Sequence, residues 1–89
     1  MKSDKARAAV CSNVAAILRE ERLRRNLSLS TLAATAGLSY QIISYVEREM
    51  RTPNLDTLLR IADALEVDPA EILRQARLRA GRVGRSRAT

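Results

Sequence analysis

The chain has 89 residues, a formal net charge of +6, one Cys and no His. This length supports a single domain with one modest core, and one Cys without His excludes an intramolecular disulfide and a Cys/His metal site. Apolar residues make up 46% of the chain, and two Tyr are its only aromatic residues, a composition that favours packed helices over a β-sheet.

A first helix is predicted from Asn13 to Arg25, where apolar residues recur at helical spacing among charged ones. The segment before it is rich in Ala, Lys and Arg, which are good helix formers. It either extends this helix backwards or forms a disordered arm, because Ser12 is also able to cap a fresh start. Residues 1–12 are therefore assigned as an N-terminal arm or a helix extension.

Two short helices are predicted next. The first begins behind an N-cap at Ser28 and ends at Gly37, and the second begins behind Ser39 and ends near Glu47. Two short helices about three residues apart and joined through Gly are typical of a helix-turn-helix, here over about residues 28–47. The buried stripe of the second helix comprises Val46 and either Ile42 or Ile43.

Two longer helices follow a polar loop that ends at Pro53. Asn54 caps a fourth helix with a dense apolar face that reaches Leu65. A cap at Asp68 and a proline in the first helical position begin a fifth helix, predicted from Pro69 to about Ala80.

The division of the chain follows from these elements. Residues 13–80 form the helix-turn-helix domain. From Gly81 onward Gly, Arg and Ser dominate, so residues 81–89 are predicted to be a basic, disordered tail.

The positive charge is unevenly distributed. Residues 1–71 carry ten basic and ten acidic residues, and residues 28–71 are net acidic by four, with three Arg against seven acids. The excess either contacts DNA phosphates or forms a solvated face, and net charge does not decide between the two. All of it lies in Arg74, Arg77, Arg79, Arg82, Arg85 and Arg87.

Residues between Leu27 and Pro69 match one known family at fixed spacing. The agreements are Leu32-Ala33, Gly37, Ile43-Ser44, Val46-Glu47, Pro53, and the Leu58 to Leu65 segment with its Ile61-Ala62. On these residues the chain resembles the helix-turn-helix domains of phage repressors and Cro proteins, the Xre family, over about Val14 to Leu73. The resemblance implies an all-α fold: a compact five-helix, lambda-repressor-like DNA-binding domain whose helices two and three form the helix-turn-helix.

The second helix of the motif is the predicted recognition helix. Ile43 and Val46 attach it to the core, so its opposite face points outward and carries Tyr40, Gln41, Ser44 and Tyr45. The resemblance implies that this helix enters the major groove and that these residues contact bases. Gln41 has the most direct chemistry, because its amide both donates to and accepts from the adenine edge. The alternative is that the tyrosines only cover apolar surface.

Phosphate contacts are expected at the starts of both motif helices and in the loop that follows them, because free N–H groups at helix N-termini attract anions. Ordinary capping by the serines and solvated loop charges are the alternatives. The candidates are Ser28, Ser39, Arg48, Arg51 and Thr52.

Two positions depart from the family, and two others match an ion pair that is found in it. Leu29 and Glu49 depart from it, since relatives often have a phosphate-binding Gln and a Gly there; Glu49 predicts a different bend in the loop and weaker DNA binding. The resemblance also implies an internal ion pair between Arg22 and Glu47, with a phosphate contact by Arg22 as the alternative.

The function predicted is a sequence-specific transcriptional regulator of double-stranded DNA, a repressor that binds a palindromic operator as a homodimer without a cofactor. Either an apolar strip on the fifth helix or the Ala6 to Val10 segment supplies the dimer surface, and the alternative is that both belong to the core. The strip comprises Ile72, Leu73, Ala76, Leu78 and Val83. The alternative is an antitoxin or other protein-docking module with the same fold, which binds a toxin or polymerase and represses its own operon. An enzyme is not expected, because no catalytic constellation is present. With no apolar run of about 20 residues and no signal peptide, the protein is expected in the cytoplasm, at the nucleoid.

Overall fold

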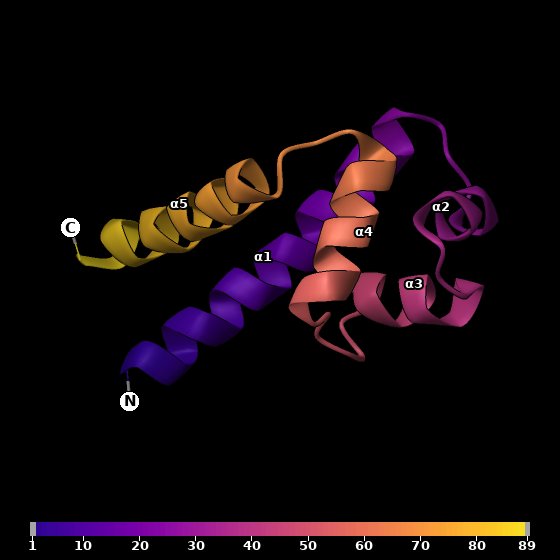
Figure 1. Cartoon of the computed structure of the whole chain (residues 1–89). Coiled ribbons are helices and arrows are strands. Elements are labelled where there is room, and N and C mark those ends of the chain that lie inside the picture. Colours follow the sequence, from indigo (N-terminus) through magenta and orange to yellow (C-terminus); the bar gives the residue numbers. More distant parts are fainter. Residues whose placement is uncertain (1, 89) are drawn as a thin grey trace.

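The computed structural model describes residues 2–88, and the side chains of residues 4–81 among them. The described residues form only α-helices and their connections, which confirms the predicted all-α class (Figure 1). The helices are α1 (Lys2–Arg24), α2 (Leu29–Ala36), α3 (Tyr40–Glu47), α4 (Leu55–Leu65) and α5 (Pro69–Ala88).

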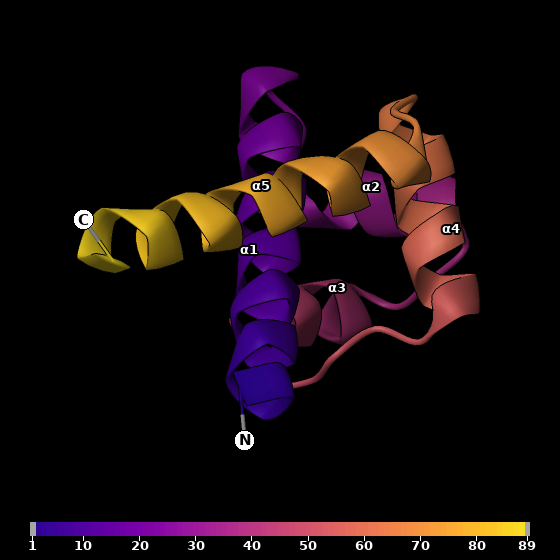
Figure 2. The ribbon, with the colours of Figure 1, turned by 90° about the vertical axis from the view of Figure 1, so that its left-hand side faces the viewer.

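The helices form a cluster with two projecting ends. The short helices α2 and α3 pack against each other, α4 packs on α2, and α5 packs on α1. In Figure 2, α5 crosses the middle of α1, and the N-terminal part of α1 and the C-terminal part of α5 lead away from the cluster in different directions. None of the described helices is long and apolar enough to cross a membrane.

One aliphatic core joins all the helices. Its most enclosed side chains come from four of them: Leu18, Leu32, Ile43, Val46, Ile61 and Leu65. Small residues lie where helices approach closely, and Ala33, Ala62 and Ala76 are buried in the same cluster. Of the two candidates on the recognition helix, Ile43 is buried and Ile42 is only half-buried.

Helix α1 is continuous through Ser12, so the N-terminal segment extends the helix. Val10 packs against the core, and the side-chain amide of Asn13 donates to the backbone oxygen of Ala76 on α5 at 3.0 Å. Contacts on both sides of Ser12 therefore favour one helix over a break.

The two motif helices begin and end as predicted. Ser28 Oγ accepts a hydrogen bond from the backbone N–H of Thr31 at 3.0 Å, and Ser39 Oγ accepts one from that of Ile42 at 3.1 Å. Gly37 follows α2 with φ of 70°, a left-handed conformation that costs Gly little. A side chain there would also meet Arg60, whose Nη1 lies 3.3 Å from the Cβ position.

Helix α5 is longer than predicted. Asn54 and Asp68 cap α4 and α5 as expected, with hydrogen bonds of 2.8 Å and 2.9 Å from backbone N–H groups. The backbone of α5 continues past Ala80 to Ala88, where a disordered tail was expected from Gly81. The Ala and Arg residues of this segment are good helix formers, and they outweigh the two glycines within it. Its side chains from residue 82 on, and residue 89, lie outside the described part.

Candidate nucleic-acid interface

Helix α3 forms one outer edge of the cluster, with α1 and α4 on the other side of it (Figure 1). Ile43 and Val46 are each 1% exposed and hold its inner face on the core. Its outer face is open: Tyr40 is 55% exposed, Gln41 is exposed, and Ser44 and Tyr45 are half-exposed. A helix attached along one side and open along the other is suited to enter a groove.

The side chains at the C-terminal end of this face are in contact with one another. Gln41 Nε2 donates a hydrogen bond to Tyr45 Oη at 2.7 Å. The guanidinium carbons of Arg48 and Arg51 each lie 5.8 Å from the centroid of the Tyr45 ring, within the range of a cation–π interaction. We call Gln41, Tyr45, Arg48 and Arg51 the Tyr45 cluster. The sequence predicts all four residues as site residues but not their contacts with one another, although residues 41, 45 and 48 have the spacing of one helix face.

The end of α3 brings Arg51 back to this face. Glu49 has φ of 61°, and the backbone N–H of Met50 donates to the oxygen of Tyr45 at 2.9 Å, which together make a helix end of the Schellman type. The sequence predicts that Glu49 alters the bend of this loop. In the structure Glu49 takes a left-handed conformation, which Gly adopts more readily than other residues.

The other predicted phosphate contacts lie apart from the Tyr45 cluster along the motif. Ser28 and Ser39 stand at the N-termini of α2 and α3, and both hydroxyls serve as caps. Thr52 is exposed in the loop after α3. No described residues form a group of His, Cys, Asp and Glu able to hold a metal ion.

Arg22 and Glu47 form an ion pair beneath the recognition helix. Arg22 Nε and Nη2 donate to the two carboxylate oxygens of Glu47 at 2.7 Å and 2.9 Å, and Nη1 donates to the backbone oxygen of Leu27 at 2.8 Å. The side chains are 10% and 6% exposed. The hydrogen bonds to Glu47 raise the pKa of Arg22 above its usual value. Arg22 therefore directs its guanidinium donors to partners inside the protein and not to a phosphate.

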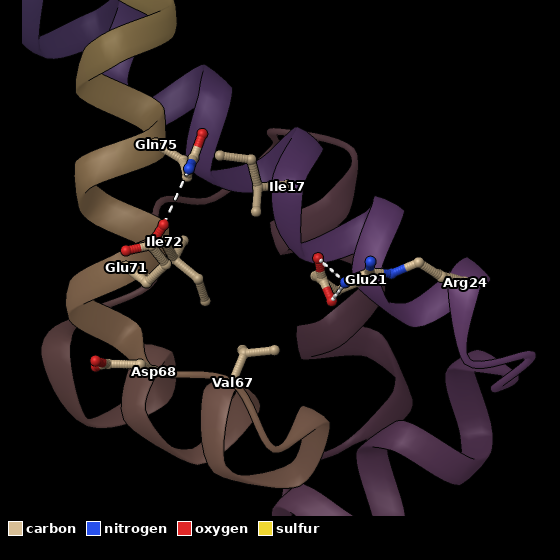
Figure 3. A pocket seen from close by; sticks show the side chains of 8 residues that line it. All are labelled: Ile17, Glu21, Arg24, Val67, Asp68, Glu71, Ile72 and Gln75. Carbon is tan, nitrogen blue, oxygen red and sulfur yellow. Dashed lines mark hydrogen bonds and ion pairs between the residues drawn. The ribbon is translucent and has the colours of Figure 1, made fainter.

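A shallow pocket of about 250 Å³ lies between α1 and the start of α5 (Figure 3), and no residue of α3 lines it. Ile17, Val67 and Ile72 supply apolar surface, and polar side chains around the pocket already have hydrogen-bond or ion-pair partners within the protein. Glu21 pairs with Arg24, and Glu71 accepts from Arg74 and Gln75, which lowers the pKa of Glu71 to about 2. These pairings leave the exposed face of α3 as the stronger candidate site.

Comparisons with known proteins agree with this geometry. A family model described as helix-turn-helix matches residues 18–72. Two HTH-type transcriptional regulators of Mycobacterium tuberculosis, MT0491 and Rv0474, are each 41% identical over 56 residues, which are 63% of this chain. The match spans 39% of the length of those regulators.

Two solved structures are also similar. The restriction-modification controller protein C.AhdI from Aeromonas hydrophila is 35% identical, with a TM-score of 0.67 over 73% of this chain and 97% of that one. A point mutant of the restriction-modification controller protein C.Esp1396I is 25% identical, with a TM-score of 0.70 over 75% and 87% of the two chains.

Proposed function

This chain belongs to the helix-turn-helix family of DNA-binding transcription regulators, and from that premise we propose that it is a sequence-specific repressor acting on a palindromic operator. The observation that carries the proposal is the outer face of α3, which is held rigidly on the core and presents exposed polar side chains. The likeness to two restriction-modification controller proteins supports a role in gene control.

The proposed contacts divide into base reading and backbone binding. Tyr40, Gln41 and Ser44 face the bases of the major groove, and the amide of Gln41 reads an adenine edge. Arg48 and Arg51 bind phosphates, helped by Thr52 and by the N–H groups at the starts of α2 and α3. Capping by Ser28 and Ser39 is compatible with phosphate binding at the same helix starts. Each serine side chain bonds to one backbone N–H group, and other N–H groups of the first turn stay free.

A symmetric dimer is the proposed binding form, since a domain of this size reads only a few base pairs. The dimer surface proposed is on α5, where Leu73 and Leu78 are 40% and 42% exposed. The apolar strip expected there is narrower than the sequence suggested, because Ile72 and Ala76 belong to the core. Val83, the remaining residue of that strip, lies outside the described side chains.

Binding-site selection from random duplex DNA at two salt concentrations tests the proposal. Wild-type protein should enrich a palindromic sequence. Gln41→Ala should relax preference at one position of each half-site, at a cost of about 1–3 kcal/mol. Arg51→Ala should weaken binding to all sequences alike and reduce the salt dependence by about one phosphate.

Arg24→Ala is the matched control, because Arg24 is exposed at the far end of α1 and pairs with Glu21. It should bind DNA like the wild type. Enrichment of no sequence at either salt concentration would refute a sequence-specific regulator.

A further inference from the structure

We propose that Tyr45 is a positioning residue that couples base reading to backbone binding. Its hydroxyl holds the Gln41 amide, and its ring holds Arg48 and Arg51 on the same face. The inference rests on the proposed function and assigns Tyr45 a different role from the base contact that the sequence suggested. Tyr45 acts through its three neighbours.

The hydroxyl leaves Gln41 able to read a base. An amide nitrogen carries two hydrogens, so the bond of 2.7 Å to Tyr45 Oη uses one of them. The remaining N–H and the carbonyl oxygen are the donor and acceptor that the adenine edge requires. Gln41 is exposed, and a long exposed side chain loses rotamer freedom when it binds. The bond to Tyr45 restricts that freedom before DNA arrives.

The ring supplies a neutral platform for two cations. Residues 28–71 contain only three Arg, and Arg60 is already paired with Asp56 at 2.8 Å. Among the described side chains, Arg48 and Arg51 have no carboxylate partner and lie over the Tyr45 ring. A cation held by a ring keeps its charge and its donors available, whereas a carboxylate would compete with phosphate for both. Because residues 28–71 are net acidic, Arg48 and Arg51 are the main source of positive charge for phosphate binding in this part of the chain.

The backbone joins the two halves of the cluster. The N–H of Met50 donates to the oxygen of Tyr45 at 2.9 Å, which folds the loop so that Arg51 returns to the ring. Gln41, Tyr45 and Arg48 occupy one face of α3 by their spacing. A change at Tyr45 is therefore expected to affect both kinds of contact, and the two effects are separable by the choice of substitution.

Tyr45→Phe removes the hydroxyl and keeps the ring. The variant should discriminate less well between the selected operator and operators altered at the position read by Gln41. The ratio of the two affinities should fall about 2- to 10-fold, the effect of losing one hydrogen bond. Binding to unrelated DNA should stay at the wild-type level. In a Gln41→Ala background, Tyr45→Phe should have no further effect, which is the result of a coupled pair.

Tyr45→Leu removes the ring as well. It should also weaken binding to every sequence, by about 2- to 5-fold for each released arginine, and lower the salt slope by about one to two phosphates. Arg24→Ala is again the control, because Arg24 lies outside the Tyr45 cluster and pairs with Glu21. Circular dichroism verifies that each variant is folded, as expected for a half-exposed position.

A measurement without DNA separates this inference from the proposed function. The side-chain amide of Gln41 should have a higher NMR order parameter in the wild type than in Tyr45→Phe. Equal order parameters, or equal losses of discrimination from Tyr45→Phe with and without Gln41, would overturn the positioning role even if the wild type selects an operator. An unchanged salt slope in Tyr45→Leu would overturn the role of the ring. Failure of the wild type to select any sequence refutes the proposed function, and with it this inference.

Discussion

Arg22, whose side chain is 10% exposed, is a charged residue that the core encloses together with its partner Glu47. Its guanidinium satisfies two acceptors on Glu47 and one on the backbone of Leu27, so a link runs from α1 to the end of α3 and to the turn before α2. Such a pair adds little net stability compared with apolar residues, but loss of one partner leaves a buried charge without compensation. The orientation of the recognition helix depends on both residues.

Glu47→Gln tests this at the residue scale. We expect the free energy of unfolding to fall by about 3–5 kcal/mol, because a neutral amide leaves the Arg22 charge uncompensated. Urea unfolding followed by circular dichroism measures it. A domain is typically stable by about 5–15 kcal/mol, so the loss is a large share of the total.

Two further variants interpret the result. Glu71→Gln removes a carboxylate that pairs with Arg74 at the exposed surface, and it should leave the unfolding midpoint nearly unchanged. The double variant Arg22→Met with Glu47→Leu should recover most of the lost stability. A single-variant loss no greater than that of Glu71→Gln would show that the pair is not structural.

At the scale of elements, two helices end on a glutamate in the left-handed conformation. Glu49 follows α3 with φ of 61°, and Glu66 follows α4 with φ of 60°. This conformation costs an L-residue about 1–2 kcal/mol, and Gly adopts it freely at some cost in the entropy of the unfolded chain. The same strain at two sites, one beside the proposed DNA-binding face and one away from it, provides a matched pair of positions for substitution.

Glu49→Gly and Glu66→Gly should each raise the free energy of unfolding by about 0.5–1 kcal/mol, the balance of those two effects. Only Glu49→Gly should also strengthen DNA binding at every sequence, because it removes an acid beside Arg48 and Arg51. Chemical unfolding and DNA titration of both variants measure the two effects. Equal gains in DNA affinity would mean that backbone strain, and not the charge of Glu49, limits binding.

At the scale of the whole molecule, an ion pair joins α1 to α5, two helices that lie far apart in the sequence. Arg79 donates to both carboxylate oxygens of Glu20, 59 residues away, at 3.1 Å and 2.9 Å. These hydrogen bonds hold the pKa of Glu20 below its usual value of 4.5. A carboxylate whose pKa is lower in the folded protein than in the unfolded chain stabilises the fold at any pH above the unfolded-state pKa. This stabilisation is lost as the pH falls through the folded-state pKa.

The coupling free energy between Glu20 and Arg79 should therefore depend on pH. At pH 7 a double-mutant cycle with Glu20→Gln and Arg79→Met should give roughly 0.2–1 kcal/mol, because both groups are largely exposed to solvent. The coupling should persist down to about pH 4.5 and decline below it. Urea unfolding from pH 7 to pH 3 measures it. A coupling that is constant over this range would mean that the pair does not titrate with folding.

Much of the fold was predictable from the sequence because its signals are local. Ser28, Ser39 and Asn54 cap helices by bonding to an N–H group three residues ahead, and Gly37 ends α2 through its own backbone. For the site, the outward residues of α3 followed from helical spacing once Val46 was assigned to the core. Their roles toward DNA stay predictions.

Other features depended on packing between distant segments. Ile43 is buried in place of Ile42 because of how α3 meets α2 and α1. The left-handed conformation of Glu49 and the position of Arg51 also could not be predicted from local spacing. Arg51 reaches the Tyr45 ring only because the loop after α3 turns back.

The sequence by itself determined where the motif helices begin and end and which faces are apolar, since caps and periodicity act over three or four residues. Only the tertiary structure decided that α1 runs unbroken through Ser12, that α5 is tied to it through Arg79, and that Tyr45 gathers Gln41, Arg48 and Arg51. Each of these depends on atoms that the chain brings together by packing, and spacing along the sequence does not specify how helices pack.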